Sequence, residues 1–438
     1  MTYPLGPIPW KNPLYEAAAT LWRRCRAVYH GRDAVLELAH ELTPAPANFE
    51  AAAWKRATGR APWYPAYART VAGLVGMVLR KPPTIDGGSA RYFGFGNLDG
   101  RGGDLAAITE ELVTELLHSG RAVIRQDVGG DAAIRWRVCP AAALVSWLED
   151  PDGRLTWAAL QRSRMERTRT GRDVERRVFY AVYQTGDSGP EVAAADTGGA
   201  RVGDWAALRP GNGQALSRIP LTIVDLPGGG DGGEPPKPPL VELADLNLSH
   251  FQTAAHLESA LELSAAPTLT ITDGPLQKRR STDVKTGPAT VLELPHGAKA
   301  GYVEPSGSGS RALETALARK RREMASVGAR MVDEPTRHAE TAEAVQLKAG
   351  GDRSSLHAVV NAAERGIRAA VALHSEWAGI PDPPLVTLNR DWLSHRTAPE
   401  EIERLMELLA ENAITPAELR DALERGEILP PAPGRIDA

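Results

Sequence analysis

The chain has 438 residues, of which 42% are hydrophobic, and a formal net charge of −4 at pH 7. A hydrophobic core stops growing at about 250 to 300 residues, so this length predicts several subregions. Dedicated nucleic-acid-binding proteins are strongly basic, and this chain is nearly neutral, so it does not belong to that class. Two cysteines are too few for a disulfide framework or a cysteine-based zinc site, and they indicate a reducing, intracellular origin. Neither a signal peptide nor a membrane span is visible.

Helical periodicity dominates the first 120 residues. Apolar side chains at three- and four-residue steps predict an amphipathic helix over residues 13–42 and an apolar helix over 71–79. In the second helix, Gly73 and Gly76 are expected to permit close packing. A third helix is predicted over 104–119, with Asp104 as its N-cap and Gly120 as its C-cap.

From residue 121 the pattern changes to short alternating runs that predict strands. These runs cover residues 122–126, 133–138, 144–148, 155–162, 178–183 and 219–224. The tetrapeptide 150–153, Asp-Pro-Asp-Gly, predicts a hairpin turn. The many arginines of 162–177 are typical of a solvated hairpin face. The sequence therefore predicts the α+β class.

Glycine and proline over residues 228–239 predict a loop or linker. A phosphate-binding loop is excluded there, because no Gly-Lys-Ser/Thr ending and no helix start follow in register. Next comes a long amphipathic helix over 240–264. A small insert over 266–308 carries predicted strands at 268–272, 289–294 and 300–304, and a second helix covers 310–330. This second helix has a narrow apolar face, so we expect its burial to be completed by a partner.

The C-terminal third is again helical. Helices are predicted at 340–347, along a long stretch from 356 to 374, at 399–411 and at 416–425. Residues 399–438 contain ten acidic and four basic residues, whereas residues 310–330 contain six basic and two acidic ones. The charge is therefore polarised along a chain whose total is nearly neutral.

No catalytic constellation is visible in the sequence. The ten histidines are scattered, no Walker A sequence exists, and His250 and His256 fall on different helix faces because they are six residues apart. Nothing near Cys139 predicts a lowered thiol pKa. We expect no enzyme activity, no metal and no cofactor.

The basic run Arg319, Lys320, Arg321 and Arg322 allows two interpretations. Four successive cations circle a helix, so most of them would be solvated or paired with Glu314 and Glu323. Alternatively, when repeated around a ring they would face phosphates or the acidic surface of a neighbouring subunit. The first interpretation is favoured for most of the four.

The order of these elements resembles that of the portal proteins of tailed bacteriophages, in particular the portal-like family once known only as an uncharacterised phage domain (DUF4055). The motifs that carry the resemblance are the segments 63–71, 73–76, 80–83, 117–121, 302–305 with Gly307, 328–331 and 340–342. Each motif is short, and the strength of the resemblance is their order along nearly the whole chain.

The resemblance implies a portal fold in seven parts. These are a wing at 1–233, a linker and first stem helix at 234–264, a clip at 265–309, a second stem helix at 310–331, a tunnel loop at 332–339, a long kinked helix with a return to the wing at 340–396, and a crown at 397–438. The clip and crown are shorter than is usual in the family.

By the same resemblance, about twelve copies form a ring at one capsid vertex of the virion, after assembly in the host cytoplasm. Double-stranded DNA passes through the channel, without sequence specificity, during packaging and ejection. The terminase large subunit and head-completion or adaptor proteins dock on the clip, and the major capsid protein or scaffold contacts the ring. No membrane is involved.

Three sets of site residues follow from the resemblance. The tunnel loop would present Asp333, Glu334, Arg337 and His338 to DNA, the clip would use Lys278, Arg279, Arg280 and Lys285 for docking, and the stem carries the basic run 319–322. Two alternatives stay open: another ring-forming phage head or adaptor protein, and an intracellular enzyme of unknown type.

Overall fold

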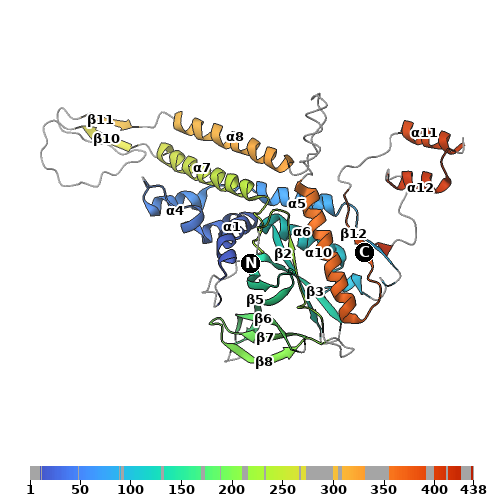
Figure 1. Ribbon diagram of the computed structural model, residues 1–438. Helices are drawn as coiled ribbons and strands as arrows, with labels where there is room; N and C mark the ends of the chain where they lie inside the picture. Colours follow the sequence, from blue (N-terminus) through green and yellow to red (C-terminus); the bar gives the residue numbers. More distant parts are fainter. Residues whose placement is uncertain are drawn as a thin grey trace.

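The computed structural model describes residues 10–437, apart from residues 11, 48, 88, 90–92, 130–132, 169–172, 188, 210–215, 231–232, 266–267, 273–298, 304–307, 331–354, 391–398, 411–412 and 426–435. The described part has a body of helices and strands, from which two long helices project side by side towards a pair of short strands (Figure 1). This confirms the predicted α+β class.

The N-terminal helical segment is broken where the sequence predicts one helix. Helix α1 (Pro13–His30) ends at Gly31, and the short helices α2 (Arg32–Glu37) and α3 (Ala39–Leu42) follow it. The prediction of one helix over 13–42 is wrong because Gly31 adopts a φ of 93°, which only glycine reaches easily. Helix α4 (Ala51–Arg60), which the sequence reading missed, precedes α5 (Ala66–Val78).

Helix α6 (Leu105–Ser119) begins and ends as predicted. The Asp104 carboxylate accepts a hydrogen bond of 2.8 Å from the backbone N–H of Ala107, and Gly120 closes the helix with a φ of 73°. A Cβ atom at Gly120 would also lie 2.9 Å from the carbonyl oxygen of Pro236. Two reasons therefore demand glycine at this position.

Two antiparallel sheets form most of the β part of the body. One has the strand order β3-β2-β9 and the other β4-β5-β6-β7-β8. Their bounds are β2 (Arg121–Val128), β3 (Ile134–Pro140), β4 (Leu144–Glu149), β5 (Leu155–Arg167), β6 (Val174–Gly186), β7 (Gly189–Ala195), β8 (Arg201–Ala207) and β9 (Leu221–Asp225). The turn at 150–153 joins β4 to β5 as predicted. Strands β7 and β8 were not predicted.

Strand β2 separates two hydrophobic cores. Ala122 and Ile124 face the core shared with the helices, whereas Val123 faces the core of the five-stranded sheet, because successive side chains point to opposite faces. At the far end of this second sheet, Arg164 and Arg177 are 65% and 63% exposed, which confirms the predicted solvated arginine face of the β5–β6 hairpin.

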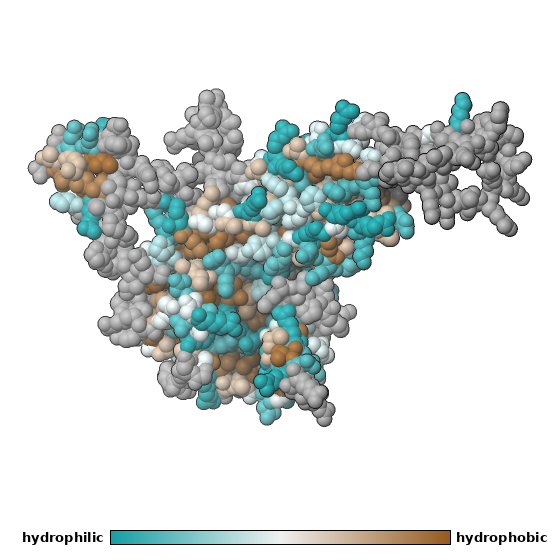
Figure 2. All heavy atoms as spheres, turned by 180° about the vertical axis from the view of Figure 1, so that it is seen from behind, coloured by the Kyte–Doolittle hydropathy of each residue, from teal (hydrophilic) through white to brown (hydrophobic). Residues whose placement is uncertain are grey.

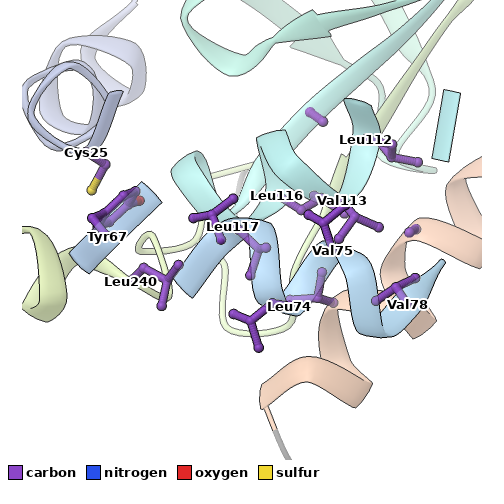
Figure 3. Packing of buried hydrophobic residues seen from close by; sticks show 14 of the residues in the cluster. Cys25, Tyr67, Leu74, Val75, Val78, Leu112, Val113, Leu116, Leu117 and Leu240 are labelled. Carbon is purple, nitrogen blue, oxygen red and sulfur yellow. The ribbon is translucent and has the colours of Figure 1, made fainter. Parts of the chain in front are cut away.

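The main core lies between α5, α6, α7, α10 and the sheet β3-β2-β9. Figure 3 shows Leu74, Val75 and Val78 of α5 packed against leucines and a valine of α6, with Cys25 and Tyr67 beside them. Helix α10 (Ser355–Ala378) crosses β9 so closely that a Cβ atom at Gly366 would collide with Val224. Gly73 and Gly76 have nothing within 4 Å of such an atom, so the expectation that they serve close packing is wrong.

The described part of segment 228–239 is irregular, as predicted, but it is held against the body. The Arg121 guanidinium donates a hydrogen bond of 2.9 Å to the Gly233 carbonyl and forms a two-bond pair with the Asp225 carboxylate, at 2.7 Å for each bond. Pro235 and Pro236 are buried. The segment therefore fixes the start of the next helix rather than acting as a free spacer.

That next helix, α7 (Val241–Ala265), runs antiparallel to α8 (Ser308–Arg330), and we call the two together the arm. Strands β10 (Thr268–Thr272) and β11 (Lys299–Val303) pair at its outer end, with Thr268 opposite Val303 (Figure 1). The strand expected at 289–294 lies outside the described residues, as does the helix expected at 340–347.

The C-terminal region leaves the body and returns to it. Strand β12 (Leu385–Thr387) pairs with β1 (Thr84–Asp86), and β13 (Ile436–Asp437) pairs with the other edge of β1. Between β12 and β13 lie α11 (Pro399–Ala410) and α12 (Pro416–Arg425), drawn apart from the body in Figure 1. Thr415 caps α12 and accepts a 3.3 Å hydrogen bond from the backbone N–H of Glu418. Single 3-10 turns occupy Phe95–Asn97 and Ala141–Ala143.

Candidate functional site: the helical arm

The arm is anchored because the first half of α7 belongs to the main core. Leu243 and Phe251 are fully buried, and the Phe251 ring meets Trp63 edge-on with 5.2 Å between ring centroids. The buried Asn247 side chain accepts a hydrogen bond of 3.1 Å from the Tyr67 N–H and donates one of 3.0 Å to the Tyr64 carbonyl. These contacts fix the direction in which the arm leaves the body.

Helix α8 contacts α7 along a narrow stripe. The positions that turn towards α7 recur at alternating steps of four and three residues, as in the seam of a two-helix coiled coil. They are Leu313, Leu317, Lys320, Met324 and Val327. Of these five, only Leu317 and Met324 are fully buried. Most other residues of α8 are exposed, so packing within one chain covers only one side of the helix.

Lys320 is the polar member of this seam. Its ammonium group donates hydrogen bonds to the Ser249 carbonyl at 3.0 Å and to the Ser249 and Thr253 hydroxyls at 2.7 Å each. Burial lowers the pKa of Lys320, and the neighbouring Arg319 lowers it further. The role of this cation is to fix α8 against α7, because all three of its donors bind oxygens of α7.

Arg321 lies on the side of α8 that faces α5. Its guanidinium is 5.3 Å from the centroid of the Tyr64 ring and donates a 3.3 Å hydrogen bond to Nε2 of His250. Arg69 lies 5.8 Å from the same ring centroid. Burial, followed by the nearby Arg321 and Lys320, lowers the pKa of His250 to about 4, so this histidine is a neutral acceptor at pH 7.

The other two cations of the basic run point away from α7. Arg319 is 67% exposed and lies 3.6 Å from Glu323 one turn further on. Arg322 is exposed and has no partner among the described residues. The basic run is therefore divided by the helix, because successive residues differ by about 100° in direction. Two cations stabilise the arm and two face solvent.

The opposite side of the arm is hollowed by a groove of about 560 Å³. Its lining combines two apolar residues with three carboxylates and two serines: Glu242, Asp245, Leu246, Ser249, Glu323, Ser326 and Val327. Asp245, which is half exposed, binds the partly buried Arg24 of α1 at 2.8 Å. We call this feature the acidic groove. The sequence reading did not single it out, since its carboxylates come from two helices far apart in the chain.

The remaining predicted site residues cannot be placed. The clip residues Lys278, Arg279, Arg280 and Lys285, and the tunnel-loop residues Asp333, Glu334, Arg337 and His338, lie outside the described residues. Tyr64, Arg69 and His250 were not predicted as functional, although Tyr64 and Arg69 belong to a segment that carries the portal resemblance.

Two other kinds of feature are absent from the described part of the chain. No group of three or more His, Cys, Asp or Glu side chains is arranged to hold a metal ion there. None of the helices described is both long and apolar enough to span a bilayer.

Taken by its architecture, the chain is an α+β protein with a projecting helical arm. Residues 239–378 match the model of DUF4055, whose description is "Domain of unknown function", and this match covers the arm and α10. No curated protein matches the sequence at a significant level.

Three solved chains share a distant likeness in shape. They come from the neck of an empty GTA particle computed with C6 symmetry (15% identity, 88% of this chain and 95% of that chain covered, TM-score 0.44), from the virion of a native gene transfer agent particle (15%, 91% and 99%, 0.41) and from the neck of a native GTA particle computed with C12 symmetry (16%, 87% and 94%, 0.40).

Proposed function

We propose that this chain is the portal protein of a tailed bacteriophage. In this role it forms a ring-shaped channel at one capsid vertex, through which double-stranded DNA is packaged and ejected. The observation that carries the proposal is the arm. Two antiparallel helices leave a well-packed body and end at a two-stranded sheet, in the order that the portal resemblance requires of stem and clip.

The packing of α8 supports a ring. A helix that buries one narrow stripe against α7 and exposes its other sides gains little stability within one chain. Repetition around a rotation axis would place a neighbouring arm beside each exposed side. The DUF4055 match coincides with this region, from the start of α7 to the end of α10.

The parts of the channel follow from this assignment. Residues 1–233 would form the wing, 265–309 the clip on which terminase and head-completion proteins dock, 332–339 the tunnel loop, and 397–438 the crown. Asp333, Glu334, Arg337 and His338 mix both signs of charge. Such a loop would contact passing DNA without holding it, because each neutralised phosphate would add affinity and slow translocation.

Electron microscopy of the purified chain tests the proposal. We expect closed rings, about twelve subunits each, with a central channel wide enough for duplex DNA. Rings with a narrower channel would contradict DNA passage and would favour another head or adaptor protein. A compact monomer or dimer at every concentration, together with its absence from the vertex of assembled heads, would contradict the whole proposal.

The tunnel loop has its own test in assembled heads. Replacing Arg337 and His338 by alanine is expected to change the amount of DNA packaged per head or the rate of packaging. The matched variant Arg322→Ala removes a cation from the arm instead. Unchanged packaging in the loop variant would remove these two residues from any contact with DNA.

A further inference from the structure

The two long sides of the arm differ in charge. One side carries the acidic groove, and on the other side Arg321 of α8 and Arg69 of the adjoining α5 share the Tyr64 ring. We call this second side the cationic flank. Hydrophilic side chains also cover much of the arm on the face shown in Figure 2. Such a surface is suited to polar contacts.

Helix geometry keeps the two sides apart. Arg321 and Glu323 are two residues apart, which places them about 200° from each other around α8. The seam residue Lys320 holds α8 in this orientation through its three hydrogen bonds to α7. The arm therefore cannot present both charges to the same neighbour surface.

The cationic flank lacks a counter-charge in the part of the chain that the structure describes. Among the described residues, neither Arg69 nor Arg321 has a carboxylate partner, and both are exposed. A guanidinium stacked on an aromatic ring keeps its N–H edge free for a carboxylate. On the same exposed face of α5 lie Gly73 and Gly76, which have no neighbouring atom within 4 Å of a Cβ position. The surface beside the two cations is therefore flat and open.

The acidic groove has the complementary features. Glu242 has no partner among the described residues, and the half-exposed carboxylates of Asp245 and Glu323 contact arginines that solvent also reaches. Exposed ion pairs contribute little, about 0 to 1 kcal/mol, so these carboxylates can exchange partners. Leu246 and Val327 line the groove between the carboxylates and offer apolar surface that a neighbouring chain would cover.

We propose that the acidic groove of one copy binds the cationic flank of a second copy of this chain. The two surfaces differ, so the contact is head-to-tail, and repeating it produces a closed ring if the rotation closes. This inference rests on the proposed function, and it specifies the interface between neighbouring subunits of the proposed ring. A second copy fits better than DNA as the occupant, because a duplex on the cationic flank would leave every acidic groove unpaired.

Charge reversal tests the interface. One variant, Arg69→Glu with Arg321→Glu, makes both sides of the arm acidic, and another, Glu242→Lys with Glu323→Lys, makes both sides basic. Alone, each variant is expected to need at least about tenfold more protein for half-maximal assembly than the wild type, since like charges then meet. Mixed in equal amounts, the two are expected to regain rings, because an alternating order makes every interface complementary.

The matched control is Arg322→Glu, which reverses a charge on the back of α8 and should leave assembly unchanged. Because Arg321 also contacts His250, each variant is checked by thermal unfolding, and the single variants Arg69→Glu and Glu242→Lys repeat the test at exposed positions outside that contact. Assembly is measured by mass photometry and the composition of mixed rings by native mass spectrometry.

The outcomes separate this inference from the proposed function. If the wild type and both charge-reversed variants form rings equally well, the proposed interface is wrong and the portal proposal is unaffected. Rings of Arg69→Glu/Arg321→Glu that form normally but retain less DNA in heads would assign the flank to DNA and overturn the interface. A wild type that never assembles and is absent from the vertex of assembled heads contradicts both proposals, and failure of the mixture to regain rings contradicts the head-to-tail pairing.

Discussion

In the body, Leu112 and Leu116 of α6 are completely enclosed, whereas Leu313 of α8 keeps part of its side chain in solvent. The same residue type thus has different surroundings in two regions of one chain. Enclosed leucines make dense contacts on all sides, and a half-enclosed one forgoes part of them. The body therefore holds its own structure, and the arm depends more on polar contacts and on whatever lies beside it.

Polar groups show the same contrast. In the body, His374 accepts a 3.0 Å hydrogen bond from the Trp136 indole, and His118 lies 3.2 Å from the Tyr67 hydroxyl, both deep in the core. In the arm, Lys320 crosses from one helix to the other at a partly exposed position. These two body histidines are neutral, and the buried cation Arg121 of the body is paired with Asp225, whereas the seam of the arm relies on a partly exposed cation, as expected from the cost of burying an unpaired ion.

The largest predicted loss of stability comes from a substitution in the body. Leu112→Ala removes a fully buried side chain and should lower the free energy of unfolding by about 2 to 5 kcal/mol. Leu313→Ala in the arm should cost less than about 1 kcal/mol in the unassembled chain, because solvent already reaches this side chain. Urea denaturation of both variants at one protein concentration measures the difference. Equal losses would show that the arm is part of the same enclosed core.

The next effect concerns pH and the neutral histidines of the body. Burial lowers the pKa of His118 to about 3 and that of His374 to about 4. The unfolded chain, with histidine pKa values near 6.5, binds more protons between pH 6.5 and these values, so stability falls as the pH falls through that window. From pH 7.5 to pH 5.5 each histidine should cost about 1.4 kcal/mol.

A conservative variant checks the assignment of this pH dependence. His374→Gln keeps an acceptor for the Trp136 indole but has no proton to gain, so the loss between pH 7.5 and 5.5 should shrink by about 1.4 kcal/mol. Denaturation curves at the two pH values provide the measurement. An unchanged loss would show that His374 binds its proton equally well in the folded and unfolded chains, and would contradict the lowered pKa.

A smaller effect is expected at the seam of the arm. Lys320→Ala removes three hydrogen bonds from α8 to Ser249 and Thr253 and should cost about 1 kcal/mol, below the usual 1.5 to 3 kcal/mol for charged hydrogen bonds because the group is partly exposed. Hydrogen exchange of α8 amides should increase while that of α6 stays unchanged. Equal protection of α8 in the variant would contradict the role of Lys320 as the link between the helices.

Most of the fold could be predicted from local sequence patterns. Helix α6 was predicted to the residue because its caps, Asp104 and Gly120, are encoded within the helix ends themselves. The break at Gly31 was missed because apolar periodicity continues across it, and only the left-handed turn reveals that the helix ends. Strand β8 was missed since most of its residues are exposed, so it lacks the alternation that identifies a strand.

The site was harder to predict for a different reason. The sequence marks the run 319–322 as basic, but only the orientation of α8 decides that Lys320 faces α7 and Arg322 faces away. The acidic groove combines Glu242 with Glu323, which are separated by the whole length of the arm in sequence. Charged residues that only the tertiary fold brings together form no pattern in the local sequence, whereas helix caps and apolar periodicity do.

The smallest predicted change in stability concerns Arg322 and compares it with Lys320 of the same basic run. Arg322→Ala removes an exposed cation with no partner in the described part of the chain, so the free energy of unfolding should change by less than about 0.5 kcal/mol. Lys320→Ala, two residues away, should lower the free energy of unfolding by more, because it removes hydrogen bonds. Denaturation of the two variants at the same pH compares the two losses. If Arg322→Ala were the more destabilising of the two, then α8 would be rotated about its axis, and the division of the run into cations that bind α7 and cations that face solvent would be wrong.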